Sequence, residues 1–181
     1  MKLEPQSTGD LARLGELIEG MSVAMLTTVG DDGALISRPM EALEMDRDGA
    51  LWFFTDLRFD LGERLRAINF TFVDDARATY VSVSGRGEIA KDEQRIARLW
   101  TRFDKASFPD GPESRHLALL KFVPARAEYW DAPNSRAVRL FALAASAVAG
   151  TPLGRTDHEV LDNLSSSSSA ATAGAGAAAL R

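Results

Sequence analysis

Apolar and polar residues alternate along much of the chain, a pattern typical of strands that bury one face. Strands are predicted over residues 23–29, 34–45, 69–73, 78–90, 117–123 and 127–130, and a wholly apolar strand over 51–55. Gly30-Asp-Asp-Gly33 and a similar turn at 46–49 join consecutive strands closely, which favours hairpins. Pro124 is expected to break the chain between the last two strands. Short connections of this kind favour a closed or partly closed antiparallel β-barrel over a parallel sheet.

Apolar residues at helical spacing mark four further segments. The first begins at Ser7, whose spacing to Asp10 resembles a capping box, and ends at Gly20. The other three cover residues 60–68, 92–102 and 138–148. Asp92 is the expected N-cap of the third segment, and Gly150 follows the last one as a stop signal. Strands nevertheless dominate, and the predicted fold class is mainly β (α+β).

Composition changes abruptly at Ser165. Five consecutive Ser residues are followed by a stretch of Ala, Gly and Thr that holds no acidic residue and one large apolar residue, Leu180. Such low-complexity sequence cannot bury a core and behaves as a flexible chain. One folded domain with N- and C-terminal helices is therefore predicted over residues 1–164, followed by a flexible tail over residues 165–181.

The chain lacks most of the side chains on which self-contained catalysis depends. Its 181 residues include two His and no Cys, which excludes thiol nucleophiles, zinc thiolate sites and disulfides. His116 and His158 cannot complete a three-His zinc site, and no Gly-x-Ser-x-Gly motif accompanies them. No metal site and no catalytic side chain are therefore predicted, and a bound cofactor is the simplest source of chemistry.

Net charge and the apolar segments limit the location and partners of the protein. The formal charge of −5 argues against binding of nucleic acid, which requires many Lys and Arg side chains on phosphates. The first ten residues contain no apolar signal segment, and the apolar stretch over residues 140–148 is too short to span a bilayer. We expect a cytoplasmic protein that binds neither nucleic acid nor membranes.

Short motifs occur along the chain in a specific order. They are Met25-Leu-Thr-Thr-Val29, Ser37-Arg-Pro-Met40, Leu51-Trp-Phe-Phe-Thr55, Tyr80-Val-Ser-Val-Ser-Gly85, Phe108-Pro-Asp-Gly-Pro112 and Glu128-Tyr-Trp-Asp131. Together, over about residues 10–164, they resemble the general stress protein 26 branch of the pyridoxamine 5′-phosphate oxidase-like split barrels, which bind flavin mononucleotide (FMN). The resemblance implies a six-stranded antiparallel split β-barrel with flanking helices. It also implies a homodimer with FMN in the cleft between its subunits.

The resemblance assigns candidate cofactor-binding residues to the second and third strands. Arg38 corresponds to the guanidinium that binds the FMN phosphate, a role suited to its planar, bidentate fork. The backbone at Pro39 and Met40 is implied to follow the ribityl chain and the ring. Phe54 and Thr55 end the third strand, where the family places a hydroxyl near the cofactor. The alternative for Arg38 is a surface side chain bound to a neighbouring carboxylate.

The match departs from the family at Leu61, where related chains carry a Lys that completes the phosphate site. Arg58, in the same loop, is the nearest replacement. Trp130 corresponds to the aromatic side chain that the family brings near the flavin, and Ser82 and Ser84 are further candidates to face the cofactor. An anchor in the core or at a subunit interface is an equal explanation for Trp130.

Two functions of different classes follow from these residues. The first is an FMN-dependent oxidoreductase that exchanges hydride or electrons with a small-molecule donor or acceptor, for example NAD(P)H. The second is a non-catalytic split barrel that stores or senses flavin or another small molecule, which the missing Lys at position 61 favours. Oxidation of pyridoxamine 5′-phosphate is a weaker third hypothesis. The enzymes that catalyse it need further basic residues for the substrate phosphate, and after Trp130 we identify no candidates except Arg136 and Arg139.

Overall fold

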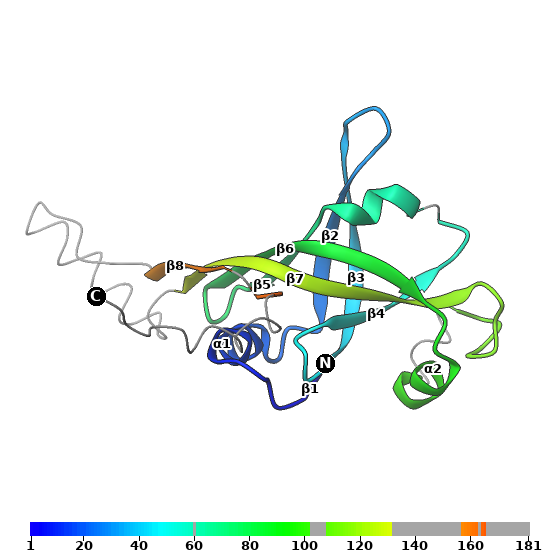
Figure 1. Ribbon diagram of the computed structural model, residues 1–181, viewed down its shortest axis with the longest axis horizontal. Helices are drawn as coiled ribbons and strands as arrows, with labels where there is room; N and C mark the ends of the chain where they lie inside the picture. Colours follow the sequence, from blue (N-terminus) through cyan, green and yellow to red (C-terminus); the bar gives the residue numbers. More distant parts are fainter. Residues whose placement is uncertain (60, 102–107, 132–156, 163, 166–181) are drawn as a thin grey trace, which may run out of the picture.

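Six antiparallel strands close into a barrel in the computed structural model, which describes residues 1–59, 61–101, 108–131, 157–162 and 164–165 (Figure 1). The strands are β2 (Val23–Val29), β3 (Leu35–Met45), β4 (Leu51–Asp56), β5 (Ile68–Asp74), β6 (Thr79–Ala90) and β7 (Leu117–Asp131). Hydrogen bonding follows the order β3-β2-β5-β6-β7-β4, and β4 pairs again with β3 to close the barrel. The predicted mainly β, six-stranded split-barrel fold is confirmed.

Two short strands extend this sheet beyond the barrel, and neither is predicted from the sequence. β1 (Lys2–Leu3) runs parallel to the end of β3, and β8 (Asp157–Asp162) runs antiparallel to the end of β7. Half of the residues of β8 are acidic, but its Leu161 is buried in the core. The Tyr129 hydroxyl of β7 also donates a hydrogen bond to the Glu159 carboxylate of β8. These two contacts attach β8 to the barrel, although its sequence lacks the alternation of a typical strand.

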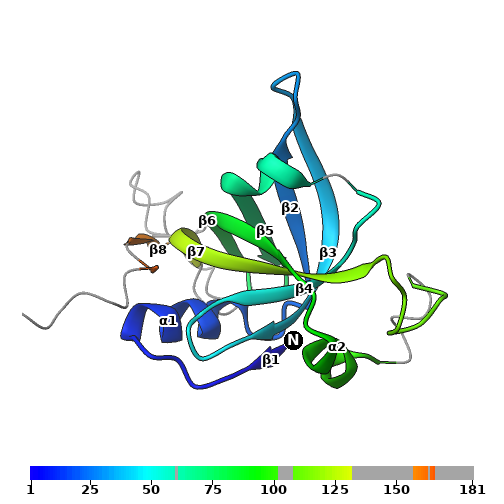
Figure 2. The same cartoon turned by 45° about the vertical axis from the view of Figure 1, so that its right-hand side comes forward.

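Helix α1 (Gly9–Ile18) packs its apolar stripe against the barrel, near β8 (Figure 2). The stripe is buried as predicted and consists of Leu11, Leu14, Leu17 and Ile18. Thr8 Oγ1 accepts a hydrogen bond from the backbone N of Leu11 at 3.3 Å. The prediction of Ser7 as the N-cap is therefore wrong by one residue, because Thr8 stands three positions before this free N–H of the first turn.

Helix α2 (Glu93–Leu99) begins at the predicted N-cap. The Asp92 carboxylate accepts a hydrogen bond from the backbone N of Arg95 at 2.9 Å. The segment predicted as helical between β4 and β5 is instead a short 3₁₀-helix, η1 (Gly62–Arg66). It brings buried Leu65 toward the barrel core before β5 begins. Both elements keep the predicted position and are shorter than the apolar spacing indicates.

Part of the chain lies outside the described residues. It includes the predicted C-terminal helix over residues 138–148 and the tail from residue 166 onward, so both stay predictions. Among the residues that the structure describes, no helix is both long enough and apolar enough to cross a membrane.

Strand β7 runs without interruption through Pro124, so the predicted break between two strands is wrong. The register of β6 against β7 shifts beside Gly85, which pairs with Pro124 and leaves Ala125 as the extra residue of a β-bulge. Proline is accommodated at a bulge because its missing N–H breaks no ladder hydrogen bond there. A Cβ atom on Gly85 would lie 2.2 Å from the carbonyl oxygen of Val123. Gly85 thus marks both the bulge and a close approach of the two backbones.

The molecule contains two apolar clusters, one inside the barrel and one between the barrel and α2. Inside the barrel, Phe70 stacks on Phe53 with ring centroids 4.2 Å apart and meets Phe122 edge-on at 5.0 Å. The second cluster joins buried and partly buried side chains, among them Trp52, Ile96, Leu117, Leu119, Phe54, Trp100 and Phe108. Trp100 is partly buried against this second cluster.

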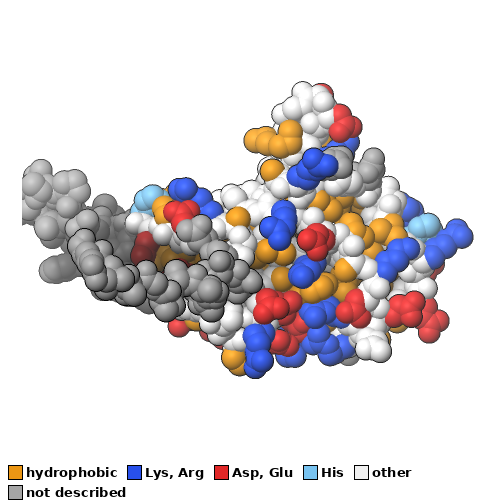
Figure 3. Space-filling model, in the orientation of Figure 1, with side chains coloured by type: hydrophobic (Ala, Val, Ile, Leu, Met, Phe, Trp, Pro, Cys, Tyr) orange, Lys and Arg blue, Asp and Glu red, His pale blue; other side chains and the backbone are white. Residues whose placement is uncertain are grey.

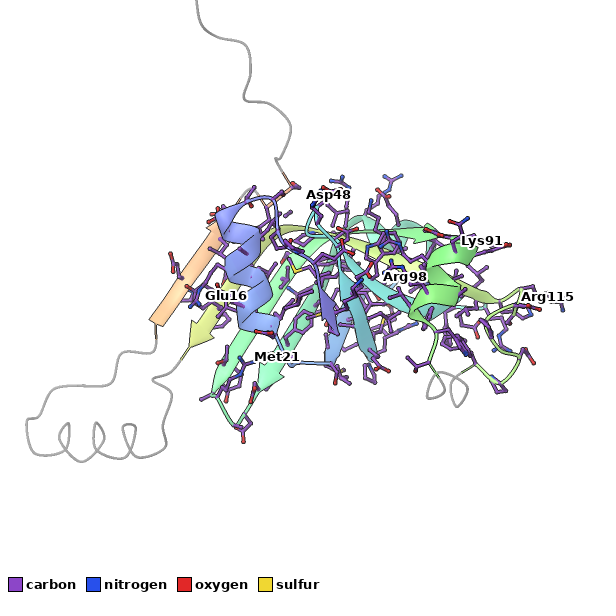
Figure 4. All side chains as sticks on the ribbon, turned by 90° about the horizontal axis from the view of Figure 1, so that it is seen from below. Glu16, Met21, Asp48, Lys91, Arg98 and Arg115 are labelled. Atoms are coloured by element: carbon purple, nitrogen blue, oxygen red, sulfur yellow. The ribbon has the colours of Figure 1, made fainter. Side chains whose placement is uncertain are left out.

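A buried carboxylate fastens α2 to the barrel. Glu44 of β3 is fully buried and accepts hydrogen bonds from Arg98 Nη1 at 2.5 Å and from Arg95 Nη1 at 2.8 Å. Figure 4 shows Arg98 on α2, beside the strands. The hydrogen bond from Arg98 is the main cause that lowers the pKa of Glu44, and burial opposes it. Two cations of the helix therefore meet one ionised carboxylate of the strand.

Candidate functional site

A cavity of about 360 Å³ lies where β3, β4 and the loop after β4 meet. Its volume is in the range of sites that bind small organic ligands. Six of the seven residues predicted for the site line it, namely Arg38, Pro39, Met40, Phe54, Thr55 and Arg58. Three of them lie on β3 and two at the end of β4, and the pairing of these strands brings the two groups to one place.

The lining of this cavity combines aromatic and charged side chains. The rings of Phe54 and Phe108 meet edge-to-face with their centroids 6.0 Å apart. Positive charge comes from Arg38 and Arg58, and negative charge from Glu41 and Asp56. Charges of both signs are intermixed over the face drawn in Figure 3, so charge alone does not mark a site on that surface. An aromatic ligand with an anionic group matches the combined lining better than a purely apolar ligand does.

Asp56 and Arg58 form an ion pair with several hydrogen bonds at the end of β4. Arg58 Nη2 lies 2.5 Å from Asp56 Oδ2, and Arg58 Nε lies 3.0 Å from each carboxylate oxygen. The backbone N of Arg58 also donates a hydrogen bond to Asp56 Oδ1 at 2.8 Å. These bonds, the side chain of Arg58 above all, lower the pKa of Asp56 to about 2. Arg58 thus lines the cavity, but its charge is matched by Asp56.

Arg38 differs from Arg58 in its surroundings. Its side chain is half-buried on β3, and within the described part of the chain no carboxylate is paired with it. Its guanidinium carbon lies 5.3 Å from the centroid of the Phe59 ring, which also lines the cavity. The alternative of a surface Arg bound to a neighbouring carboxylate is therefore not seen among these residues.

Leu61 forms an apolar part of the cavity wall. Its side chain is 4% exposed and belongs to the barrel core, together with Leu65 of η1. An ammonium group at this position would be buried among apolar side chains, which is unfavourable unless an anion neutralises it. At position 61 the cavity wall therefore carries a buried apolar side chain in place of the Lys of the family pattern.

Trp130 does not line this cavity. It lies near the end of β7 and is 36% exposed. Its ring stacks on the ring of His158 with centroids 5.0 Å apart. Ser82 and Ser84 lie on the same outer face, and their hydroxyls accept hydrogen bonds from Asn69 Nδ2 at 2.9 and 3.2 Å. A single chain thus brings together six of the predicted residues and leaves Trp130 apart.

The cavity also contains residues that the sequence does not assign to it. Phe59, Phe108 and Asp56 all line it. Phe59 is 58% exposed, and an exposed aromatic residue within the charged loop Asp56-Leu-Arg-Phe59 is the signal that points to a site. Phe108 belongs to one of the ordered motifs, but its place at the cavity depends on its contact with Phe54 and on the packing around α2.

The family is decided by a match that covers most of the chain. Residues 9–153 match the family described as pyridoxamine 5′-phosphate oxidase like. The chain belongs to this family. Among solved structures, a candidate general stress protein 26 from Jannaschia sp. CCS1 has a TM-score of 0.67 and 26% sequence identity, over 86% of this chain and 99% of that one. The predicted family is therefore confirmed by both sequence and fold.

Further members of the general stress group share the fold. A general stress FMN/FAD binding protein from Xanthomonas citri has a TM-score of 0.57 and 27% identity, over 71% of this chain and 92% of that one. A protein related to general stress protein 26 from Clostridium acetobutylicum has a TM-score of 0.58 and 27% identity, over 67% of this chain and 87% of that one. The predicted resemblance to the general stress protein 26 branch of the family is thereby confirmed. A search of the curated proteins finds no match.

Proposed function

We propose that this protein binds FMN in the cavity beside Arg38 and acts as a flavin-dependent oxidoreductase. The observation that carries the proposal is a half-buried guanidinium, with no carboxylate paired to it among the described residues, in a cavity with aromatic walls. A guanidinium in this setting suits a phosphate group. Further support comes from the family and from the relative in Xanthomonas citri, which is a general stress FMN/FAD binding protein.

The residues of the cavity suit the different parts of FMN. Arg38 can bind the phosphate, and the Thr55 hydroxyl can bond a phosphate or ribityl oxygen. Phe54 and Phe108 offer aromatic surface to the isoalloxazine ring. When bound, FMN supplies hydride and single-electron transfer. The chain then has to bind and orient the flavin and to shield part of it from water.

In this proposal the protein is a homodimer whose copies pair through the outer face of the barrel. Val23, Val73, Tyr80 and Trp130 form an apolar row across neighbouring strands and are 36–55% exposed. A contiguous exposed row of this kind favours an interface. Met25, also exposed, pairs with Pro39 at the edge of the cavity. A second copy on this face would bring its own Trp130 toward the flavin, a role that Trp130 does not have within one chain.

Titration of the purified protein with FMN, followed by flavin absorbance and fluorescence, tests the binding step. Saturation at about micromolar FMN supports the proposal, and the absence of binding in that range rejects it. Equilibrium sedimentation tests the homodimer, with Trp130→Ser as a variant in the apolar row and Trp52→Phe as a control outside it. Oxidation of NADH or NADPH faster than with free FMN supports the oxidoreductase activity.

A non-catalytic flavin-binding protein is the second candidate function. Two observations favour it, namely the apolar side chain at Leu61 and the pairing of Arg58 with Asp56. Both reduce the positive charge that the site can offer to a phosphate. Stable FMN binding without turnover above that of free FMN, for several donors and acceptors, decides in favour of this candidate.

A further inference from the structure

Phe59 is an exposed aromatic residue whose ring lies against the cationic group of the cavity. The side chain is 58% exposed, and the Arg38 guanidinium carbon lies 5.3 Å from its ring centroid. A guanidinium within about 6 Å of an aromatic centroid is attracted to the ring face. The contact also restricts the conformations of a long side chain that is otherwise free to turn toward solvent. Phe59 therefore both attracts and orients Arg38.

The turn that carries Phe59 is fixed by three hydrogen bonds that backbone N–H groups donate. The N–H of Phe59 donates to the carbonyl oxygen of Asp56 at 3.0 Å, and that of Leu57 donates to the carbonyl oxygen of His116 at 2.8 Å. The N–H of Arg58 donates to the Asp56 carboxylate at 2.8 Å, where the Arg58 guanidinium is also bound. The ion pair of Asp56 and Arg58 thus shapes the turn, and the turn presents the ring to Arg38.

The charges of the cavity make phosphate binding depend on the direction in which the Arg38 guanidinium points. Among the lining residues that the structure describes there are two Arg and two carboxylates, and Arg58 is bound to the carboxylate of Asp56. Leu61 adds an apolar wall. Arg38 is then the cation of this lining that a phosphate can approach without displacing an ion pair. Loss of its orientation would remove most of the phosphate recognition.

We infer that Phe59 is a positioning residue for phosphate recognition. Its ring holds the Arg38 guanidinium toward the cavity, and the site thereby selects an aromatic ligand that carries a phosphomonoester over the same ligand without one. The identity of the ligand as a flavin rests on the proposed function. The contact between Phe59 and Arg38, and its effect on a phosphomonoester, do not.

The experiment compares FMN with riboflavin, which has the same ring and ribityl chain and no phosphate. Affinities of both are measured by flavin fluorescence for the full chain and for Phe59→Leu, Phe59→Tyr, Arg38→Gln and the double variant of Phe59→Leu with Arg38→Gln. We expect Phe59→Leu to weaken FMN by about three- to tenfold and riboflavin by less than about twofold. Phe59→Tyr should retain the preference, because it keeps an aromatic face. In the Arg38→Gln background, Phe59→Leu should leave the ratio of the two affinities unchanged.

An equal loss for FMN and riboflavin would overturn the inference, because Phe59 would then only contact the ring or shape the cavity. An undiminished effect of Phe59→Leu in the Arg38→Gln background would also overturn it. Circular dichroism and urea unfolding of each variant separate these results from misfolding.

A second measurement separates this inference from the proposed function. The Nε–H resonance of Arg38, assigned by its loss in Arg38→Gln, is followed by NMR during titration with phenyl phosphate. The ring of Phe59 should shift this resonance upfield in the free protein, and Phe59→Leu should abolish the shift and weaken phenyl phosphate by about three- to tenfold. If the protein binds neither flavin but shows these two effects, the proposed function fails and the role of Phe59 stands. If either effect is missing, the role of Phe59 is rejected, whether or not flavin binds.

Discussion

Glu44, which has no exposed surface, accepts hydrogen bonds from Arg98 of α2 at 2.5 and 2.9 Å. The helix covers the apolar cluster in which Phe54 and Phe108 pack, and these two rings line the candidate site. The ion pair that attaches α2 to the barrel therefore also helps to fix the shape of the cavity wall.

Substitution Glu44→Gln leaves the two Arg side chains of α2 without their shared anion. Removal of one partner of a buried ion pair costs about 3–5 kcal/mol, and the partial exposure of Arg95 and Arg98 reduces this cost. We expect the free energy of unfolding, measured in urea, to fall by about 2–3 kcal/mol. Glu88→Gln is the matched control, because Glu88 is exposed and its ion pair lies on the surface. A loss no larger than that of the control would show that Glu44 does not hold the helix.

Asp56 gives stability a dependence on acid pH. Arg58 lowers the pKa of this carboxyl from the ordinary 3.8 to about 2. Because the folded pKa lies below the unfolded one, the ionised carboxylate stabilises the fold above about pH 4, and this contribution is lost as the pH falls toward 2. Asp56→Asn removes the group, so the difference in unfolding free energy between wild type and variant should shrink over that range. Urea unfolding from pH 6 to pH 2 measures the difference, and a constant value would contradict the expectation.

Arg38→Gln should weaken FMN and spare riboflavin. Loss of a charge-assisted bond to phosphate costs about 1.5–3 kcal/mol, which corresponds to about tenfold or more in affinity. Riboflavin, which has no phosphate, should change by less than about twofold. Fluorescence titration gives both values, and Arg47→Gln, in the exposed turn between β3 and β4, is the control. Unchanged affinity for FMN in Arg38→Gln would remove Arg38 from the site.

Gly85→Ala should destabilise the barrel at the bulge. The new Cβ would lie 2.2 Å from the carbonyl oxygen of Val123 and 2.8 Å from a ring carbon of Phe122. The backbone cannot yield as a flexible side chain does, so we expect a loss of about 2–4 kcal/mol in the free energy of unfolding. Gly9→Ala, which meets no atom within 4 Å, should change it by less than about 0.5 kcal/mol. Similar stabilities for the two variants would mean that β6 can move away from β7.

The barrel could be predicted because alternation and turn residues are local signals. The uninterrupted β7 could not be predicted. Pro124 locally indicates a break, but the strand continues because Pro124 pairs with Gly85 of another strand at a bulge. β8 escaped prediction for a related reason. Half of its residues are acidic, and its pairing depends on contacts with β7 and the core, such as the buried position of Leu161.

The candidate site was predictable where residues lie on strands and less so where they lie in the loop. Arg38 and Thr55 meet because β3 pairs with β4, which the order of the motifs implies. The sequence suggests Arg58 as a replacement for the missing Lys, because spacing alone does not reveal that Asp56 binds it. The contact of Phe59 with Arg38 depends on the path of the turn and has no counterpart in the pattern.

The pairing of Met25 with Pro39 has a consequence for how ligand binding must be measured. It joins the exposed apolar row to the edge of the cavity, so a second copy on that row and a ligand in the cavity would share one boundary. Free energies of binding at two linked sites are reciprocal, so if the second copy adds contacts to the ligand, the ligand strengthens the pairing of the copies by the same factor. Dilution of the protein should then weaken its ligand, and excess ligand should lower the concentration at which the copies separate. The amount of protein present would itself set how much of it is loaded.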